Sequence, residues 1–374
     1  MNRIDDIVKT LKTIASDPRK AVEDYKKKTG KGAVGVMPPY APEEIVYAAG
    51  FLPVGMWGAE KKPIAKARAY LPPFASSIAQ SIMELELEGY YDNLDAVIFS
   101  VVSDTLKCMS DKWHGKAPVV VFTHPQNRKI AAAVPFLVEE YRLLTYKLEQ
   151  ILKVRIKEEA LQNAIEVYNA NRKVMREFSD LAALHLDLIT PAARHAVIKA
   201  RWYMDKAEHT KLVEALNDEL RKAPASAFKG KRVVTTGLQV EPDDVLDIFQ
   251  EFGFGIVADD VADESRQFRL DVPAGNDALT RLAKWWQDFD GCPFATDPLK
   301  PRGQMIIDLA KKHGADAVIV CMMKFCDPEE WDYPILVKEF DAAGLANIMI
   351  EIDQEVNSFE QIRTRIQTFA DVLS

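Results

Sequence analysis

Cys326 is the residue whose type and position in the chain are best suited to chemistry. It follows an almost unbroken apolar run, Ala317 to Met323. That run is too short for a typical helix and predicts a strand buried on both faces, as in a parallel sheet. Asp327 and Pro328 come next and should stop the strand. Because open α/β sheets bind ligands at the carboxyl ends of their strands, a thiol there is a candidate metal ligand.

The other thiols, Cys108, Cys292 and Cys321, add no recognisable metal motif. No two cysteines are spaced as CxxC, so the spacing is not that of a zinc site. Cys321 and Cys326 are an odd number of residues apart, which puts them on opposite faces of an extended segment. We therefore do not expect them to share one metal. The alternative for each cysteine is a small buried hydrophobe.

Other catalytic motifs are missing or weak. No GxGxxG follows a strand, no GxxxxGK[ST] occurs, and the six histidines show no HExxH spacing. The chain therefore lacks the sequence marks of a dinucleotide fold, a P-loop and a zinc peptidase. The run Asp259–Arg266 is dense in carboxylates and follows a predicted strand. It is either a solvated turn that caps itself or a loop that binds a cation or positions a substrate.

Strands and helices alternate at both ends of the chain, and the middle is helical. Strands are predicted over 32–37, 52–57, 94–102, 117–122, 233–238, 255–258, 317–323 and 347–352. Helices are predicted among others over 333–343 and after Ser358, where Ser358 and Gln361 could form a capping box. The pattern indicates an α/β fold with two Rossmann-like (flavodoxin-like) parallel-sheet lobes. The predicted domains are an N-terminal lobe over 1–130, a helical region over 131–229 and a C-terminal lobe over 230–374.

Composition excludes several classes of function. The chain has 374 residues, 28% of them charged, and a formal net charge of −8. An acidic balance gives no reason to expect nucleic-acid binding. No apolar run reaches the roughly 18 to 20 residues that span a bilayer. The charged N-terminal segment does not resemble a signal peptide, so a cytoplasmic location is expected.

Several long motifs resemble one known family. They are Met37–Gly58, Asp104–Lys107, Thr123–Arg128, Val257–Asp260, Ser265–Arg266, Met322–Glu330 and Arg363–Ala370. Together they are similar to the 2-hydroxyacyl-CoA dehydratase and benzoyl-CoA reductase family along the whole chain. The form Phe325–Glu330 resembles the second, or beta, subunit of the dehydratases.

The resemblance implies a radical enzyme built from several proteins. The family's large subunits hold a 4Fe-4S cluster on three cysteines between two α/β lobes. A homologous alpha subunit binds the substrate, and an ATP-hydrolysing iron-sulfur activator supplies one electron. The implied reaction is the dehydration of an (R)-2-hydroxyacyl-CoA to a 2-enoyl-CoA through a ketyl radical.

This sequence departs from the family at the cluster. The three cysteine positions correspond to Ser76, Ser103 and Cys326, so one thiol remains. Iron-sulfur clusters are held by thiolates, whereas a serine hydroxyl is far less acidic and is a hard oxygen donor. The implied 4Fe-4S cluster should therefore be labile or absent.

Two other readings stay open at the level of sequence. The chain could be a cluster-free relative that serves as a partner subunit or as a non-redox acyl-CoA-binding protein. It could also be a two-lobed protein that binds a small molecule, although the missing export signal weakens this reading.

Overall fold

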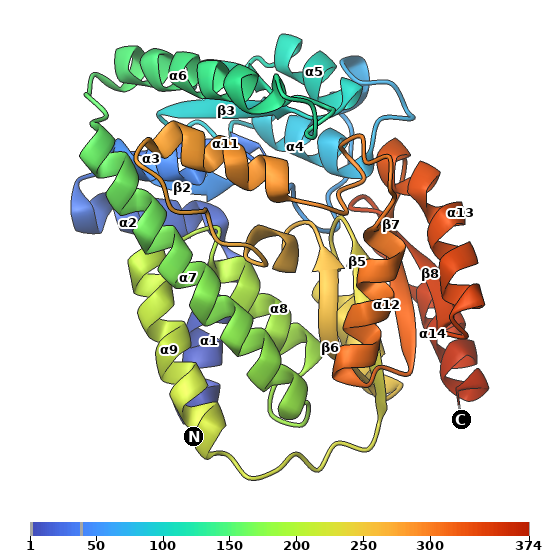
Figure 1. Cartoon of the computed structure of the whole chain (residues 1–374). Coiled ribbons are helices and arrows are strands. Elements are labelled where there is room, and N and C mark those ends of the chain that lie inside the picture. The colour runs from blue at the N-terminus through green and yellow to red at the C-terminus, as the bar shows by residue number, and fades with distance from the viewer. Residues whose placement is uncertain (1–2, 38–39, 374) are drawn as a thin grey trace.

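The computed structural model of the chain describes residues 3–37 and 40–373 (Figure 1). Within these residues it forms two parallel sheets of four strands each. The N-terminal sheet has the order β2-β1-β3-β4, and the C-terminal sheet has the order β6-β5-β7-β8. The first set of strands is β1 (Ala33–Met37), β2 (Leu52–Gly55), β3 (Ala96–Val101) and β4 (Val119–Thr123). The second set is β5 (Lys231–Gly237), β6 (Phe254–Val261), β7 (Ala317–Met323) and β8 (Ala346–Ile352).

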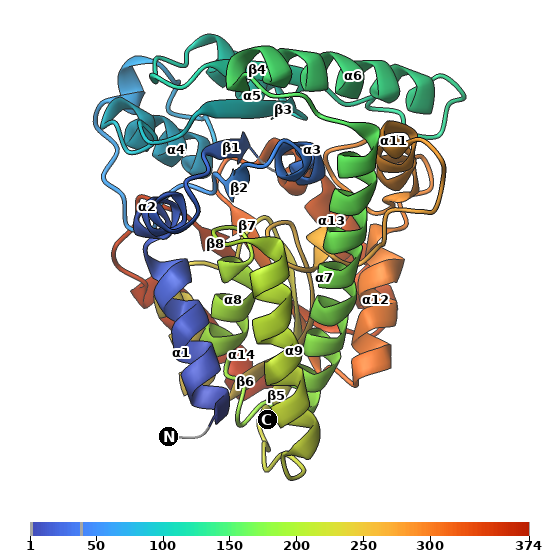
Figure 2. The ribbon, with the colours of Figure 1, turned by 90° about the vertical axis from the view of Figure 1, so that its left-hand side faces the viewer.

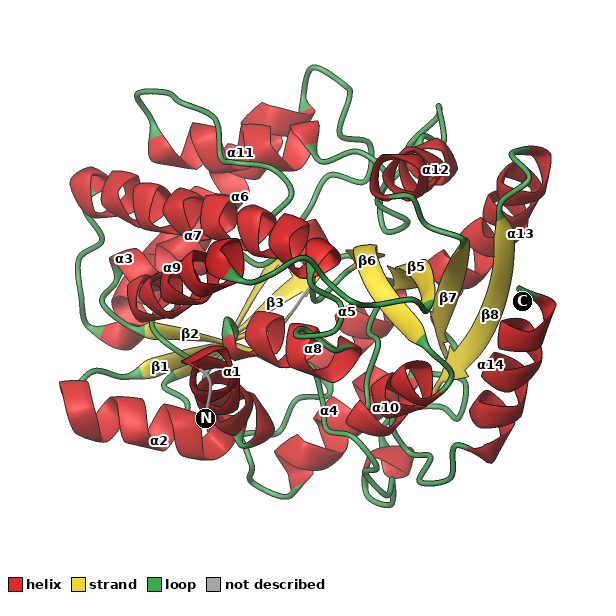
Figure 3. Ribbon diagram, turned by 90° about the horizontal axis from the view of Figure 1, so that it is seen from below, coloured by secondary structure: helices red, strands yellow, loops and turns green. Residues whose placement is uncertain are grey.

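Each sheet reverses its strand order beside the strand that comes first in the sequence, β1 in one sheet and β5 in the other. From β1 the chain moves to β2 on one side and then to β3 on the other, and β5 has β6 and β7 as neighbours in the same way. Such a reversal leaves a crevice outside the carboxyl ends of the two central strands. Figure 3 shows the strands of the C-terminal sheet in the order β6, β5, β7 and β8, with the edge strand β8 nearest α13 and α14.

Helices cover the sheets and fill the space beside them. In the N-terminal part these are α1 (Arg3–Ser16), α2 (Pro18–Thr29), α3 (Glu43–Ala48), α4 (Ser77–Leu87), α5 (Asp104–Asp111) and the short 3-10 helix Ala67–Ala69. The middle part holds α6 (Ala133–Leu152), α7 (Glu158–Leu184), α8 (Pro191–Ala200) and α9 (Lys206–Lys222). The last part holds α10 (Asp243–Glu251), the 3-10 helix Ser265–Gln267, α11 (Ala278–Asp288), α12 (Arg302–His313), α13 (Asp327–Ala342) and α14 (Glu360–Val372).

The hydrophobic core explains why these elements hold together. Every residue of β7 is buried, because helices cover both faces of the C-terminal sheet. Apolar residues of α10 and α14 pack on one face, and those of α12 and α13 pack on the other. A separate cluster joins α1 to α7, α8 and α9, and Figure 2 shows α1 standing beside α8 and α9. The N-terminal helix α1 is therefore packed against helices from the middle of the chain.

The predicted fold class, two parallel α/β lobes with a helical middle, is confirmed. Three local predictions are wrong. Strand β6 continues to Val261, α13 begins at Asp327 rather than near Tyr333, and Ser358 caps no helix because α14 starts at Glu360 without a side-chain cap. The domain boundaries at 130/131 and 229/230 stay a prediction. No helix in the described residues is long and apolar enough to cross a membrane.

Candidate functional site

Ser76, Ser103 and Cys326 line one cavity of about 210 Å³, although they are far apart in the sequence. We call it the switch-point cavity. Its lining residues are Met37, Met56, Trp57, Ser76, Ile78, Ala79, Ile82, Ser103, Asp104, Thr105, Leu106, Leu238, Phe294, Phe325, Cys326, Asp327 and Pro328. The wall contains Met37 at the end of β1, the link after β3, Leu238 just after β5 and the turn after β7. These are the four strands at which the two sheets reverse their order, so both crevices open into the same space.

Each of the three residues is the N-cap of a helix. Ser76 precedes α4, Ser103 precedes α5 and Cys326 precedes α13. The Ser103 hydroxyl accepts a hydrogen bond of 3.4 Å from the backbone N–H of Leu106, whereas Ser76 and Cys326 make no side-chain cap bond. A helix start carries unpaired N–H groups and the positive end of the helix dipole. Three such helix starts, those of α4, α5 and α13, therefore lie at the wall of the switch-point cavity.

The donor set does not fit a cluster held by three thiolates. Cys326 is the one cysteine in the cavity wall, and it is only 5% exposed. Burial, reinforced by the charge of Glu329, raises the pKa of the Cys326 thiol, so it stays protonated at neutral pH. Cys108, Cys292 and Cys321 do not line the cavity. Among the residues that the structure describes, no three or more His, Cys, Asp or Glu side chains are grouped to hold a metal ion.

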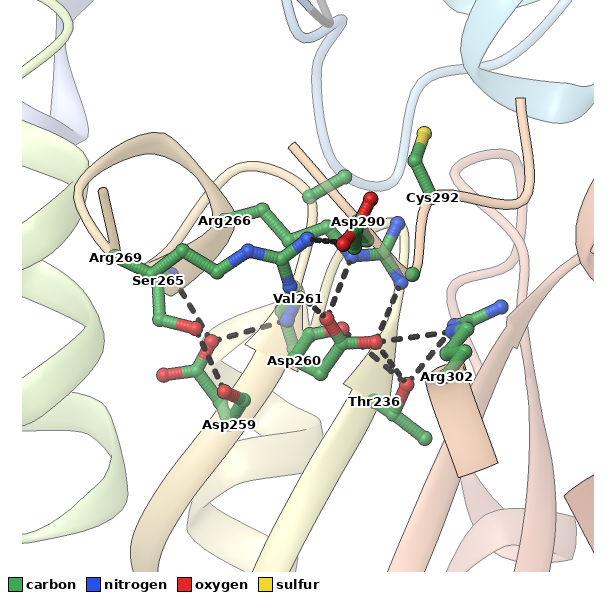
Figure 4. A network of polar contacts seen from close by, with 12 residues as sticks. Thr236, Asp259, Asp260, Val261, Ser265, Arg266, Arg269, Asp290, Cys292 and Arg302 are labelled. Atoms are coloured by element: carbon green, nitrogen blue, oxygen red, sulfur yellow. Dashed lines mark hydrogen bonds and ion pairs between the residues drawn. The ribbon is translucent and has the colours of Figure 1, made fainter. Parts of the chain in front are cut away.

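Buried charges hold the helix start that carries Cys326. Asp260, at the end of β6, accepts hydrogen bonds from Arg266 (3.1 Å), Arg269 (2.9 Å) and Arg302 (3.0 Å), as Figure 4 shows. Arg266 and Arg302 also bind Glu329, in the first turn of α13, at 3.2 and 2.7 Å. Arg302 reaches Asp332 in addition, at 3.0 Å. We call these six residues the Asp260 network, and they tie α13 to β6 and α12.

The expectations for the run Asp259–Arg266 are partly wrong. The run does cap itself, because Asp259 accepts hydrogen bonds from the backbone N–H groups of Val261 and Ser265, but it is buried instead of solvated. A role in positioning a substrate stays a prediction. Three of its carboxylates, those of Asp259, Asp260 and Glu264, are not free for a cation because arginines pair with them. Arg194 of α8, for example, contacts Asp259 and Glu264. Burial alone would raise the pKa of Asp260, but the charges of Arg266, Arg302 and Arg269 together lower it below its ordinary value.

A second group of charges, some buried and some partly buried, meets where the N-terminal part, α8 and the C-terminal part join. The Lys199 ammonium group lies 2.8 Å from a Glu60 carboxylate oxygen and 2.9 Å from a Glu241 oxygen. The Nε2 atom of His195 lies 3.2 Å from a carboxylate oxygen of the same Glu241. Beside them is a second cavity, of about 340 Å³, and Trp57 stands in the walls of both cavities. Burial and the nearby charge of Glu241 raise the pKa of Glu60 to about 7.

The raised pKa of Glu60 predicts a pH dependence of stability. A carboxyl whose pKa moves from 4.5 to about 7 on folding contributes stability below about pH 4.5 and loses it as the pH rises through about 7. Wild-type protein should therefore lose about 1 to 2 kcal/mol more than Glu60→Gln between pH 5.5 and 8, measured by urea unfolding. The exposed Glu360→Gln should behave like the wild type. Parallel pH curves for wild type and Glu60→Gln would contradict the assignment.

Residues 38–373 match the family described as 2-hydroxyglutaryl-CoA dehydratase, D-component. The chain belongs to this family. It is 55% identical to the lactoyl-CoA dehydratase subunit beta of Anaerotignum propionicum over 374 residues, with both chains covered completely. It is also 42% identical to the (R)-phenyllactyl-CoA dehydratase beta subunit of Clostridium sporogenes, again over 100% of both chains. Identity to the (R)-2-hydroxyglutaryl-CoA dehydratase subunit beta of Acidaminococcus fermentans is 37%, over 98% of this chain and 99% of that one.

These matches confirm the predicted family and the predicted role as one subunit of a dehydratase, a hydro-lyase. The family resemblance predicts Ser76, Ser103 and Cys326 as site residues, and the structure places all three at one cavity. Their role as cluster ligands stays a prediction. Sequence reasoning missed Trp57, Leu238 and Phe294, which complete the wall. Leu238 directly follows β5 and Trp57 lies two residues after β2, and this position near a strand end is the one available signal.

Proposed function

We propose that this chain is the beta subunit of a radical (R)-2-hydroxyacyl-CoA dehydratase. It would form a heteromeric complex with a homologous alpha subunit and receive electrons from an ATP-dependent iron-sulfur activator protein in the cytoplasm. The observation that carries the proposal is the full-length likeness to dehydratase beta subunits, combined with a cavity at the switch points of both sheets. The predicted lobes, 1–130 and 230–374, would be the two halves that enclose this cavity.

The reaction explains why such an enzyme needs a radical. The proton at C3 of a 2-hydroxyacyl thioester is barely acidic, so an ordinary base cannot remove it. One electron added to the thioester carbonyl gives a ketyl radical, which expels the C2 hydroxyl group as hydroxide. Loss of the C3 proton then gives a second ketyl, and this returns the electron to leave the 2-enoyl-CoA. The balance is the loss of one water, and the electron is recovered.

This chain's own residues favour an arrangement in which the alpha subunit carries out the electron transfer. Two of the three cluster positions are serine, and no other thiol reaches the cavity. A cluster-free subunit would still supply the fold, the partner surface and the cavity. A protein that works alone and binds acyl-CoA without redox chemistry is the second candidate, which the apolar cavity wall supports.

Anaerobic purification of the native complex tests the proposal. We expect a homologous second subunit to accompany this chain, and dehydration of lactoyl-, phenyllactyl- or 2-hydroxyglutaryl-CoA to require ATP, a reductant and the activator. Iron and sulfide bound to the isolated chain should be near zero. A chain that purifies alone and dehydrates nothing with the activator present would contradict the proposed role. About four irons in the isolated chain would contradict the cluster-free form of it.

A further inference from the structure

We propose that a second copy of this chain binds at one edge of the N-terminal sheet, where strand β4 and one side of helix α6 are exposed together. We call this surface the β4–α6 edge. The proposal goes beyond the proposed function, because it joins two copies of the same chain and involves neither the switch-point cavity nor electron transfer. In a complex with an alpha subunit, the contact would link two such complexes.

Strand β4 is an edge strand with free backbone groups. Within the described residues it pairs with β3 alone, and the carbonyl of Pro118 accepts a hydrogen bond of 2.9 Å from the N–H of Val97 in β3. Because the backbone groups of successive strand residues point in opposite directions, those of Val119 and Val121 point away from the sheet. No partner for these groups occurs at this edge among the described residues. An open edge strand is a template for pairing with another chain.

The same edge carries an apolar side of helix α6. Glu140 accepts a hydrogen bond of 2.8 Å from the backbone N–H of Thr123, which also points outward from β4, so this side of α6 faces the free edge. Phe136 and Leu143 lie four residues before and three residues after Glu140, so they share its side of the helix. They are 45% and 46% exposed, although both residue types are usually buried. Figures 1 and 2 show α6 along the outer border of the molecule, with no described element above it.

Two-fold symmetry makes the β4–α6 edge complementary to itself. Two copies of β4 related by an axis through Val121 would run antiparallel, and the two Val121 residues would exchange both of their backbone bonds. Val121 lies about 6.6 Å before Thr123 along the strand, a distance that corresponds to about four residues of an α-helix. Because α6 returns along β4 and touches Thr123 at Glu140, the axis passes close to Leu143. Each Leu143 would then pack on its own copy.

The charges on α6 also fit an antiparallel second copy. Lys147 lies on the stripe of Phe136, Glu140 and Leu143, and it makes no ion pair with the residues that the structure describes. In an antiparallel pair that meets at Leu143, Lys147 of each copy lies beside Glu140 of the other. A parallel pair would place Glu140 beside Glu140, and like charges repel. The stripe therefore selects the same orientation as the strand edge.

The size of the β4–α6 edge limits how tightly two copies bind. Helix α6 has 20 residues and β4 has five, so their lengths are about 30 Å and about 17 Å. With a width of about 10 Å for each element, one copy would bury on the order of 500 Å². Stable interfaces bury about 800 Å² per partner. We therefore expect a weak, reversible dimer whose population rises with protein concentration.

Sedimentation equilibrium of the purified full chain, from low micromolar to submillimolar protein, tests the proposal. We expect a reversible equilibrium between one chain and a dimer of twice its mass. Leu143→Lys places two ammonium groups at the two-fold axis and should raise the dimer Kd at least tenfold. Leu184→Lys is the matched control, because Leu184 is an exposed leucine in the last turn of α7. It should leave the Kd unchanged, and circular dichroism checks that both variants are folded.

Two further variants test the strand edge and the position of the axis. Val121→Pro removes an outward N–H, which an edge strand tolerates, and should also raise the Kd at least tenfold. In a background with the exposed Cys108 changed to serine, Leu143→Cys should form a disulfide-linked dimer on mild oxidation. Leu184→Cys should not. These cysteine variants keep the proposal testable if Val121→Pro fails to fold.

Several outcomes would overturn the proposal. They are a chain that stays monomeric at every concentration, equal effects of Leu143→Lys and Leu184→Lys, and a dimer that Leu143→Cys does not cross-link. If Leu143→Lys instead stops a homologous second subunit from co-purifying, that subunit covers the β4–α6 edge and the proposal is wrong. Because no dehydration is measured, failure of the proposed function leaves the result unaffected.

Discussion

Replacing Ser76 and Ser103 together by cysteine should turn this chain into a brown protein that takes up about four irons and four sulfides on anaerobic reconstitution. The two serines and Cys326 already line one cavity. Cysteine is close to serine in shape, so the backbone need not move. Thiols near a metal deprotonate readily to thiolates, which offsets the burial that now keeps the Cys326 thiol protonated. Iron and sulfide analysis and the visible colour of the protein measure the outcome.

A variant with the same number of thiols is the right control. Ser76→Cys combined with Ser358→Cys adds two cysteines, but Ser358 is exposed and lies outside the cavity wall. It should stay colourless or bind iron only loosely. The Ser103→Cys change also removes a helix cap, so we expect it to cost about 1 kcal/mol in the free energy of unfolding. A double variant that remains colourless while still folded would show that the three positions are not cluster ligands.

The local sequence around Ser76, Ser103 and Cys326 does not predict that these residues lie at one cavity. The apolar run of β7 predicts a buried strand because both its faces are covered, and that prediction is correct. Residues at the carboxyl ends of β3 and β7 meet because two sheets face one another across the cavity. Nothing near Ser103 in the sequence indicates that Cys326 is its neighbour. The resemblance supplied the grouping, and the strand order explains it.

The wrong predictions have two physical causes. The strand stops before Asp327 and Pro328 as predicted, but the helix that the sequence predicts near Tyr333 begins already at Asp327, because proline is favoured in the first turn of a helix. The sequence predicts a loop at Asp259 and Asp260 because the predicted strand over 255–258 ends just before them, whereas β6 continues to Val261. Their partners Arg194 and Arg302 come from α8 and α12, and only the tertiary fold brings them together.

Arg302→Met should be the most destabilising single change in the Asp260 network, costing about 3 to 5 kcal/mol in urea unfolding. Arg302 is buried and bonds to Asp260, Glu329, Asp332 and the hydroxyl of Thr236. Removing the Arg302 guanidinium leaves the buried carboxylates of Asp260, Glu329 and Asp332 with one positively charged partner fewer. The exposed pair Arg363–Glu251 supplies the control, and Arg363→Met should cost about 1 kcal/mol or less. Similar costs for the two variants would contradict the role assigned to the network.

A second substitution separates lost charge pairing from lost packing. Adding Glu329→Gln to Arg302→Met removes one of the carboxylates that the first change leaves unpaired. If charge dominates, the double variant should recover about 1 kcal/mol or more of the stability lost in Arg302→Met. If packing dominates, Glu329→Gln should only add its own loss of stability to that of Arg302→Met. Because Glu329 lies three residues after Cys326 and donates its backbone N–H to the Cys326 carbonyl at 2.9 Å, loosening this turn should expose the thiol. Mass-spectrometric labelling should therefore modify Cys326 faster in Arg302→Met than in the wild type, and the double variant should reverse part of that increase.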